Sequence, residues 1–279
     1  MRQNFRRDVQ LCFCSFSSVA ATPERILRFA VVSCAFLASG MPAAYAAPIN
    51  YGDFMGTDFT YEDVTEDSNS GDTPPLYGPP TVSGNSLDFT PVGFSAFAAN
   101  GAADITDGNL AFMVTAKPNR VIQNIKITEF GDTTLAGLGS DNTMTAAVAT
   151  GVLNIHEVDG TGINVVSVPV SFTMSPSGGT YGLGTDGGGG PVFNTQWMGM
   201  LFVDVQQTLI AHNIPFEFGA TKISLDYDNR LIAVSQEATT ALIAKKDHLI
   251  ITTNIPEPAA CTLAVLGMLA SALVWRRSH

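Results

Sequence analysis

The chain has 279 residues, of which 46% are hydrophobic and 14% are charged, and acidic side chains outnumber basic ones by 25 to 14. The formal net charge of −11 repels a phosphate backbone, and there is no excess of Lys and Arg to bind one. We therefore expect no nucleic-acid partner, which removes DNA- and RNA-binding proteins from the function classes that fit this sequence.

The first 46 residues have the composition of a secretory signal peptide. Five arginines form its basic part, namely Arg2, Arg6, Arg7, Arg25 and Arg28. An apolar run at 29–46 follows and ends in the small-residue site Ala44-Tyr45-Ala46. We predict passage through the secretion translocon and cleavage by signal peptidase after Ala46. An N-terminal transmembrane anchor is the less favoured alternative, because the apolar run is short and ends in small residues and Pro42.

The predicted exported region is more acidic than the whole chain and contains no cysteine. Residues 47–258 carry 23 acidic and 7 basic side chains, a net charge of −16. The four cysteines lie in the terminal segments, at Cys12, Cys14, Cys34 and Cys261. We therefore expect an ordinary hydrophobic core without disulfides, for which roughly 200 residues are ample. Thiolate metal sites and cysteine nucleophiles are excluded from this region.

Strands dominate residues 47–254. Apolar and polar side chains alternate in LAFMVTA at 110–116, VSVPVSFTM at 166–174 and KISLDYD at 222–228, and this period of two indicates strands with one buried face. Pro169 lies on the polar side of the second stretch and predicts an edge strand or a bulge, because proline cannot donate to a ladder. Less regular strand candidates fill most of the remaining sequence.

Turn signals separate the predicted strands. Asp107-Gly108 and Asp159-Gly160 fit tight turns, because both residue types accept a positive φ. The segments 205–213 and 235–244 could each form a short helical turn. About a dozen short strands without βαβ alternation predict an all-β fold, an antiparallel β-sandwich or jelly-roll-like domain.

Candidate chemistry in this domain is sparse. Asp226 and Asp228 share one strand face beside Asn229, and such oxygen donors could hold Ca²⁺, although a solvated acidic face is the favoured interpretation. His156-Glu157 could bind a metal or form an acid–base pair, and the acidic stretch 62–67 contains the paired carboxylates that glycosidases use. Both patterns also arise by chance in an acidic domain, so we expect no catalytic residue.

Aromatic residues could instead form a platform on which sugar rings stack. The candidates lie in or near predicted loops and strand ends: Tyr51, Phe54, Phe59, Tyr61, Tyr77, Tyr181 and Trp197. A sandwich must also bury many Phe and Tyr side chains, so their number does not decide between the two roles. Carbohydrate binding is therefore kept as an alternative function.

The last 26 residues combine a proline hinge, an apolar run and a basic end. Pro256-Glu257-Pro258 cannot lie inside a helix, because proline removes a backbone donor and restricts the residue before it. Residues 259–275 contain no charge and reach the lower length limit of a transmembrane helix. Arg276 and Arg277 follow, and the positive-inside rule places them on the cytoplasmic side. A buried core helix is the less favoured alternative.

This order of features closely resembles the PEP-CTERM sorting signal of exported proteins in Gram-negative bacteria. The resemblance implies that Pro256, Glu257 and Pro258 are read by a membrane-embedded exosortase, and that Arg276 and Arg277 are stop-transfer charges. It implies a transient inner-membrane anchor, followed by delivery to the cell surface or to the extracellular polysaccharide matrix. The short basic end, which closes with Ser278-His279, departs from the pattern and slightly weakens the anchor.

These observations predict three segments: a signal peptide at 1–46, an acidic β-sandwich at 47–254 and a sorting tail at 255–279. We expect a non-enzymatic structural or adhesive protein of the surface or matrix, with exosortase and extracellular polysaccharide as partners. A carbohydrate-binding module is the main alternative, and a glycan-active hydrolase is a third. No metal or cofactor is expected apart from the Ca²⁺ candidate at Asp226 and Asp228.

Overall fold

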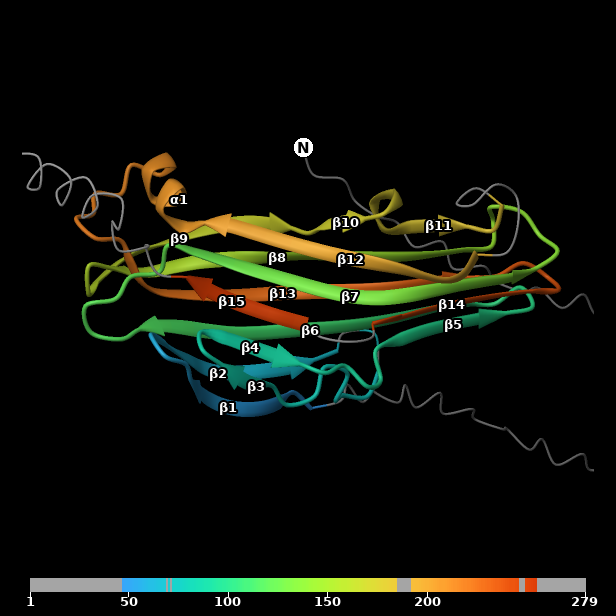
Figure 1. Ribbon diagram of the computed structural model, residues 1–279, viewed down its shortest axis with the longest axis horizontal. Helices are drawn as coiled ribbons and strands as arrows, with labels where there is room; N and C mark the ends of the chain where they lie inside the picture. The colour runs from blue at the N-terminus through green and yellow to red at the C-terminus, as the bar shows by residue number, and fades with distance from the viewer. Residues whose placement is uncertain (1–46, 69, 71, 185–191, 246–248, 255–279) are drawn as a thin grey trace, which may run out of the picture. The chain divides into compact units, whose positions relative to one another are not determined.

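The computed structural model describes residues 47–68, 70, 72–184, 192–245 and 249–254. Fifteen strands of this part of the chain form two antiparallel sheets that pack face to face, with one α-helix at one end (Figure 1). The all-β sandwich expected from the alternation of side chains is thus confirmed. Within the described residues, no helix combines the length and apolar character that crossing a membrane requires.

The first sheet contains seven strands in the order β1-β2-β6-β13-β8, with β9 and β11 both paired to the far side of β8. Its strands are β1 (Ile49–Met55), β2 (Phe59–Asp67), β6 (Ala103–Ala116), β8 (Met144–Val158), β9 (Thr161–Ser171), β11 (Thr180–Gly182) and β13 (Ala220–Val234). The long strand β13 pairs with β6 on one side and β8 on the other over almost its whole length.

The second sheet contains eight strands built around β7. Its strands are β3 (Thr81–Ser83), β4 (Ser86–Phe89), β5 (Ser95–Ala99), β7 (Asn124–Gly137), β10 (Thr173–Ser175), β12 (Val192–Asp204), β14 (Thr239–Lys245) and β15 (Leu249–Asn254). One side of β7 pairs with β12, and the other side pairs with β15 and β14 in succession. The strands β4 and β5 extend the sheet beyond β15 and β14.

The core lies between the sheets and is made by the alternation that the sequence displays. Ile223, Leu225 and Tyr227 of β13 are buried, and the intervening side chains face outward, as predicted. The largest buried side chains are aromatic, namely Trp197, Tyr61, Tyr77, Tyr181, Tyr227, Phe59, Phe89 and Phe94. Their burial leaves one face of each sheet free for polar contacts.

Several strands are longer than the sequence predicted. Asp107-Gly108 was expected to form a turn but lies inside β6, opposite Asn229 of β13. A Cβ on Gly108 would lie 2.5 Å from Cε2 of Phe94, so glycine here admits an aromatic ring instead of turning the chain. Asp159-Gly160 does form the predicted turn between β8 and β9, with φ values of 49° and 75°.

The stretch 166–174, predicted as one strand, is divided between the two sheets. It ends β9 at Ser171 and resumes as β10 at Thr173, which pairs with β12 of the opposite sheet. Inward and outward side chains continue to alternate from β9 to β10, because both strands face the same core. Pro169 lies in β9, which pairs with β8 alone among the described strands, so of the two predicted alternatives the edge strand is confirmed.

The two predicted helical segments have different outcomes. The α-helix α1 (Val205–Ala211) connects β12 to β13 and is capped by Asp204, whose carboxylate accepts from the backbone N–H of Gln207 at 2.9 Å. The segment 235–244 is not helical: a turn at 237–238 leads into β14, with Ala238 at a φ of 59°. Pairing with β5 and β7 determines its conformation, which overrides a weak helical pattern.

A buried carboxylate organises the irregular segment between β2 and β3. Glu66 is completely buried and accepts backbone N–H groups from Leu76, Tyr77 and Gly78. The hydroxyl of Tyr51 donates to the same carboxylate at 2.6 Å. One side chain of the acidic segment 62–67 therefore helps to tie the proline-rich stretch at 74–80 to the sandwich.

Candidate functional site

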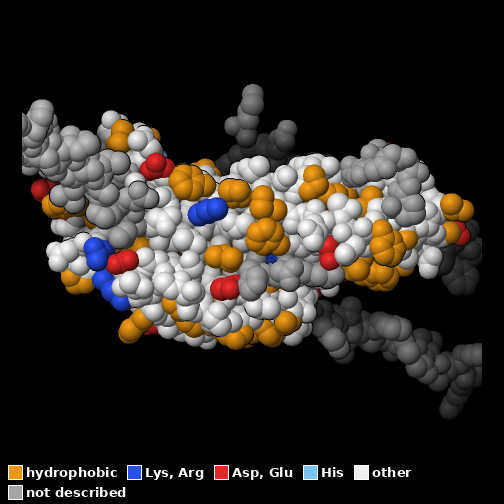
Figure 2. Space-filling view, in the orientation of Figure 1, with side chains coloured by type: hydrophobic (Ala, Val, Ile, Leu, Met, Phe, Trp, Pro, Cys, Tyr) orange, Lys and Arg blue, Asp and Glu red, His pale blue; other side chains and the backbone are white. Residues whose placement is uncertain are grey.

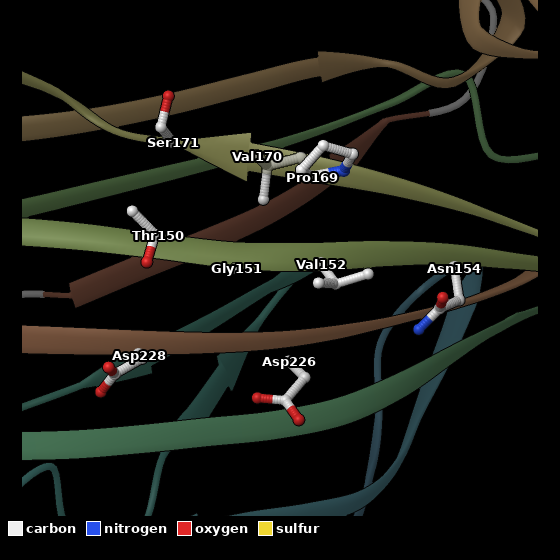
Figure 3. A pocket seen from close by; sticks show the side chains of 9 residues that line it. All are labelled: Thr150, Gly151, Val152, Asn154, Pro169, Val170, Ser171, Asp226 and Asp228. Carbon is white, nitrogen blue, oxygen red and sulfur yellow. The ribbon is translucent and has the colours of Figure 1, made fainter. Parts of the chain in front are cut away.

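A groove of about 720 Å³ lies on the outer face of the first sheet. Figure 3 shows its lining on three neighbouring strands. The residues are Thr150, Gly151, Val152 and Asn154 of β8, Pro169, Val170 and Ser171 of β9, and Asp226 and Asp228 of β13. Because β9 is an edge strand whose pairing partner is β8, the groove lies at an edge of the first sheet.

Strand alternation places the two candidate calcium ligands on this face. Asp226 is exposed and Asp228 is half-buried, and both point away from the core to which Tyr227 between them belongs. The structure therefore confirms that the two side chains share one strand face. Asn229, which the sequence placed beside them, is completely buried and faces the core instead.

Both carboxylates accept hydrogen bonds from side chains of the first sheet, one on β6 and one on β13 itself. Asn109 of β6 donates from Nδ2 to Asp226 at 2.6 Å. Arg230 donates from its guanidinium to Asp228 at 3.0 Å, and it also contacts Asp107 of β6 at 2.7 Å and 2.9 Å. These pairs hold the carboxylates in a network across β6 and β13.

The electrostatics of this network are those of crowded carboxylates that share one cation. Partial burial, reinforced by the negative charge of Asp107, raises the pKa of Asp228, and Arg230 only partly offsets this. The hydrogen bond to Asp107 raises the pKa of Arg230 in turn. Asp228 therefore binds a proton more readily than an ordinary aspartate does.

A second set of polar contacts crosses the groove from β9 to β13. Ser167 donates to Oδ1 of Asn154 at 2.6 Å, and Asn154 donates to the hydroxyl of Ser224 at 3.4 Å. The Nε2 atom of His156 lies 2.8 Å from the same hydroxyl. His156, a candidate metal ligand in the sequence, is therefore a partner of Ser224.

A second pocket, of about 540 Å³, lies at the end of the sandwich near the β8–β9 turn. Its lining includes Lys117, Arg120, Glu157 and Asp159. Lys117 donates to two backbone carbonyls, and Arg120 pairs with Asp58 at 2.8 Å. Asp159 accepts three backbone N–H groups from 217–219. Three of these charged side chains, Lys117, Arg120 and Asp159, therefore hold loops together.

Metal binding has little support in the described geometry. Among the residues that the structure describes, no group of three or more His, Cys, Asp or Glu side chains is placed to hold a metal ion. Asp226 and Asp228 supply two carboxylates, and both already accept donors from the protein. An ion bound to these carboxylates would therefore compete with Asn109 and Arg230.

The aromatic residues considered for sugar stacking are mostly in the core. Five of the seven are buried, namely Phe59, Tyr61, Tyr77, Tyr181 and Trp197. Among the residues that the structure describes, the large exposed aromatic side chains are instead Phe97, Phe193, Phe202 and Phe218. On the face shown in Figure 2, hydrophobic side chains form separate groups among polar ones.

The predicted sorting and cleavage residues lie outside the described residues. This applies to Ala44 and Ala46, to the triplet at 256–258, and to Arg276 and Arg277. In the described part, sequence reasoning missed Asp107, Asn109 and Arg230, which complete the carboxylate network. The pairing of β6 with β13 brings these residues together, and no local sequence pattern predicts this pairing.

Comparison with known proteins identifies no family. No protein-family model matches the chain, and no curated protein is detectably similar to it. Among solved structures, the D431N mutant VP2 protein of infectious bursal disease virus, from derived T=1 particles, aligns with 10% identity over 76% of this chain and 58% of the viral chain. The TM-score of 0.13 is too low to carry an argument.

Proposed function

We propose that this protein is an exported, non-enzymatic structural or adhesive component of the cell surface or extracellular matrix. A signal peptide at 1–46 directs it to the translocon, and a transmembrane helix at 259–275 anchors it in the inner membrane for a time. An exosortase then acts at the tail. The observation that carries this proposal is the order of Pro256-Glu257-Pro258, an uncharged run and an arginine pair.

The described domain is compatible with a passive role. Several of its charged side chains are engaged with one another: Arg230 with Asp107 and Asp228, and Lys222 with Glu62. Glu66, a member of the acidic stretch considered for glycosidase chemistry, is used to hold a loop. A cysteine-free, acidic sandwich of this kind is suited to persist and stay soluble outside the cell.

The sorting step is tested by mass spectrometry of the C-terminus. We expect the tail to be altered in the native host and intact in the same strain lacking its exosortase. Replacing all three residues of the triplet by alanine should give the intact tail in the native host. Replacing Glu237, an exposed acidic residue outside the tail, by alanine is the matched control and should leave processing normal. A full-length tail in both strains refutes the sorting proposal.

Carbohydrate binding is the second candidate, and the groove on β8, β9 and β13 is the observation that favours it. The groove combines amide, hydroxyl and carboxylate groups with the apolar surface of Val152, Val170 and Pro169. Calorimetry with the host's extracellular polysaccharide tests this candidate. Val152→Lys should abolish binding, and Val148→Lys, on the same exposed face outside the groove, should not. Release of reducing ends in this assay would point to the hydrolase instead.

A further inference from the structure

Three polar side chains meet in the core between the two sheets. Lys245 of β14 and Glu129 of β7 belong to the second sheet, and Asn229 of β13 belongs to the first. The side chains of Lys245 and Glu129 have no exposed surface, and Asn229 is completely buried. Buried charges are costly unless they are fully paired, so this cluster requires an explanation.

Glu129 joins the other two residues through a single oxygen atom. Its Oε2 accepts from Nζ of Lys245 at 2.6 Å and from Nδ2 of Asn229 at 2.5 Å. The lysine amine and the asparagine carboxamide are therefore held against the same atom and lie side by side. Glu129 is 100 positions from Asn229 and 116 from Lys245 in the sequence, and the packing of the two sheets brings the three residues together.

When Glu129 is a charged carboxylate, two oxygen atoms of the cluster lack a hydrogen-bond donor. Neither Oε1 of Glu129 nor Oδ1 of Asn229 has a hydrogen-bond partner among the described residues. A neutral Glu129 would carry a proton that Oε1 could donate. The acceptor for this proton is Oδ1 of Asn229, whose Nδ2 already donates to Oε2 of the same carboxyl group. A carboxyl–carboxamide pair of this kind would polarise the carbonyl of Asn229.

A glycine lies opposite each of the three residues on a neighbouring strand. Gly131 lies opposite Lys245, Gly199 lies opposite Glu129 and Gly108 lies opposite Asn229. A Cβ on Gly199 would lie 2.7 Å from Oε1 of Glu129. Cβ atoms on Gly131 and Gly108 would collide with the rings of Trp197 and Phe94. Gly199 thus leaves room for Glu129 itself, and the other two glycines leave room for aromatic rings.

Aromatic rings surround the lysine and keep its environment apolar. Nζ of Lys245 lies 5.0 Å from the ring centre of Tyr77 and 4.8 Å from that of Phe94. Burial lowers the pKa of Lys245, and the contact with Glu129 only partly compensates. A lower pKa increases the share of neutral amine, which is the nucleophilic form.

We propose that Lys245 and Asn229 form an intramolecular isopeptide bond, with Glu129 as the acid–base residue that promotes it. Proton transfer from Nζ to Glu129 first yields a neutral amine and a neutral carboxyl group. The lone pair of Nζ attacks Cγ of Asn229 while Glu129 donates a hydrogen bond to Oδ1. A bond forms between Nζ and Cγ, the bond between Cγ and Nδ2 breaks, and Nδ2 leaves as ammonia after Glu129 relays a proton to it.

The products suit the core better than the starting ion pair does. The reaction converts an ammonium group, a carboxylate and a carboxamide into one secondary amide, one neutral carboxyl group and free ammonia. No oxidant, metal or cofactor is consumed, and both buried charges disappear. The new bond joins β13 of one sheet to β14 of the other, and it closes a ring that contains the chain between residues 229 and 245. This inference does not rest on the proposed function.

Peptide mapping of the purified full-length chain tests the proposal directly. Trypsin cannot cut after an acylated lysine, so we expect a branched peptide in which 223–230 is joined to 231–246. Its mass should be that of the two linear peptides less one ammonia, and fragmentation should place the link between Asn229 and Lys245. Recovery of 223–230 and 231–245 only as linear peptides from the folded protein overturns the proposal.

Variants separate the bond from a simple ion pair. Asn229→Ala and Lys245→Met should each yield only linear peptides. Glu129→Gln retains both reacting groups but removes the acid–base function, so it should reduce the branched peptide to a small fraction of the wild-type amount. Lys222→Arg, a matched control on the outer face of β13, should retain the full amount. If a variant does not fold, the wild-type map alone still decides the question.

Discussion

Single glycines determine how closely aromatic rings approach the backbone of this sandwich. Gly108 lies under both Phe94 and Tyr77, and a Cβ there would lie 2.5 Å from the first ring and 3.1 Å from the second. We expect Gly108→Ala to lower the free energy of unfolding by roughly 1–3 kcal/mol, because a well-packed core cannot absorb an added methyl group without strain. Urea denaturation followed by tryptophan fluorescence measures this change.

Gly162 provides the matched control for this substitution. It is exposed in β9, and a Cβ there would meet no atom within 4 Å. Gly162→Ala should therefore leave the urea midpoint unchanged or raise it slightly, since alanine loses less backbone entropy than glycine on folding. Equal destabilisation by both substitutions would contradict the role assigned to Gly108.

Asp159 links the β8–β9 turn to the segment before β13 and makes part of the stability dependent on pH. Its carboxylate accepts N–H groups from Glu217, Phe218 and Gly219 at 2.7–2.9 Å. Burial alone would raise its pKa, but these three bonds outweigh that effect and lower it. Because the folded-state pKa is depressed, the stabilisation is present above the usual aspartate pKa of about 3.9 and disappears as the pH falls through the lower value.

Asp159→Asn should reveal this dependence while keeping a residue that tolerates positive φ. We expect a loss of at most about 1 kcal/mol at neutral pH, because the carboxylate is largely exposed, and a shrinking loss towards about pH 3. Thermal unfolding across this range gives the comparison. Asp141→Asn, at an exposed turn aspartate, should follow the wild type throughout. A deficit at Asp159 that is constant with pH would exclude the carboxylate as its cause.

At the scale of elements, β9 presents one of the edges of the first sheet. Pro169 lies opposite Val152 of β8, and its missing N–H interrupts the row of donors that an edge strand would present. Pro169→Val should restore a continuous edge and promote self-association through strand pairing. Light scattering over a concentration series measures this effect. Ser171→Val, which adds apolar surface on the same strand without adding a donor, is the control that should remain unassociated.

The strands themselves were predictable to different degrees. The alternation in KISLDYD depends only on which side chains face the core, and its three inward residues are buried as expected. The ends of strands were harder to predict, because glycine serves two purposes in this chain. Gly160 turns the chain, whereas Gly108 accommodates a ring from a distant segment. Sequence spacing cannot separate these uses, because the ring's position is a property of the assembled core.

At the scale of the whole molecule, the dominant feature is negative charge. Residues 47–258 have a net charge of −16, so their acidic side chains repel one another in the folded state. We expect the melting temperature to rise as NaCl increases from about 0.01 M to about 1 M, which shortens the Debye length from roughly 30 Å to roughly 3 Å. Differential scanning calorimetry at constant pH is the measurement.

Calcium chloride at matched ionic strength extends this experiment. Because Asp226 and Asp228 already accept donors from Asn109 and Arg230, we expect calcium to raise the melting temperature no more than sodium does. Specific binding would add stability that grows with calcium concentration. An extra rise that Asp226→Asn removes would establish a calcium site on β13 and contradict this expectation.

The sequence by itself determined the all-β class, the acidic surface and the facing of the regular strands, because each follows from composition or from a period of two. The predicted signal peptide and sorting tail also come from local composition. Only the tertiary structure decided which strands are neighbours, and hence that Arg230 reaches Asp107 and that Lys245, Glu129 and Asn229 converge. Such contacts join residues about a hundred or more positions apart, and their register is set by how two complete sheets pack, which no local pattern encodes.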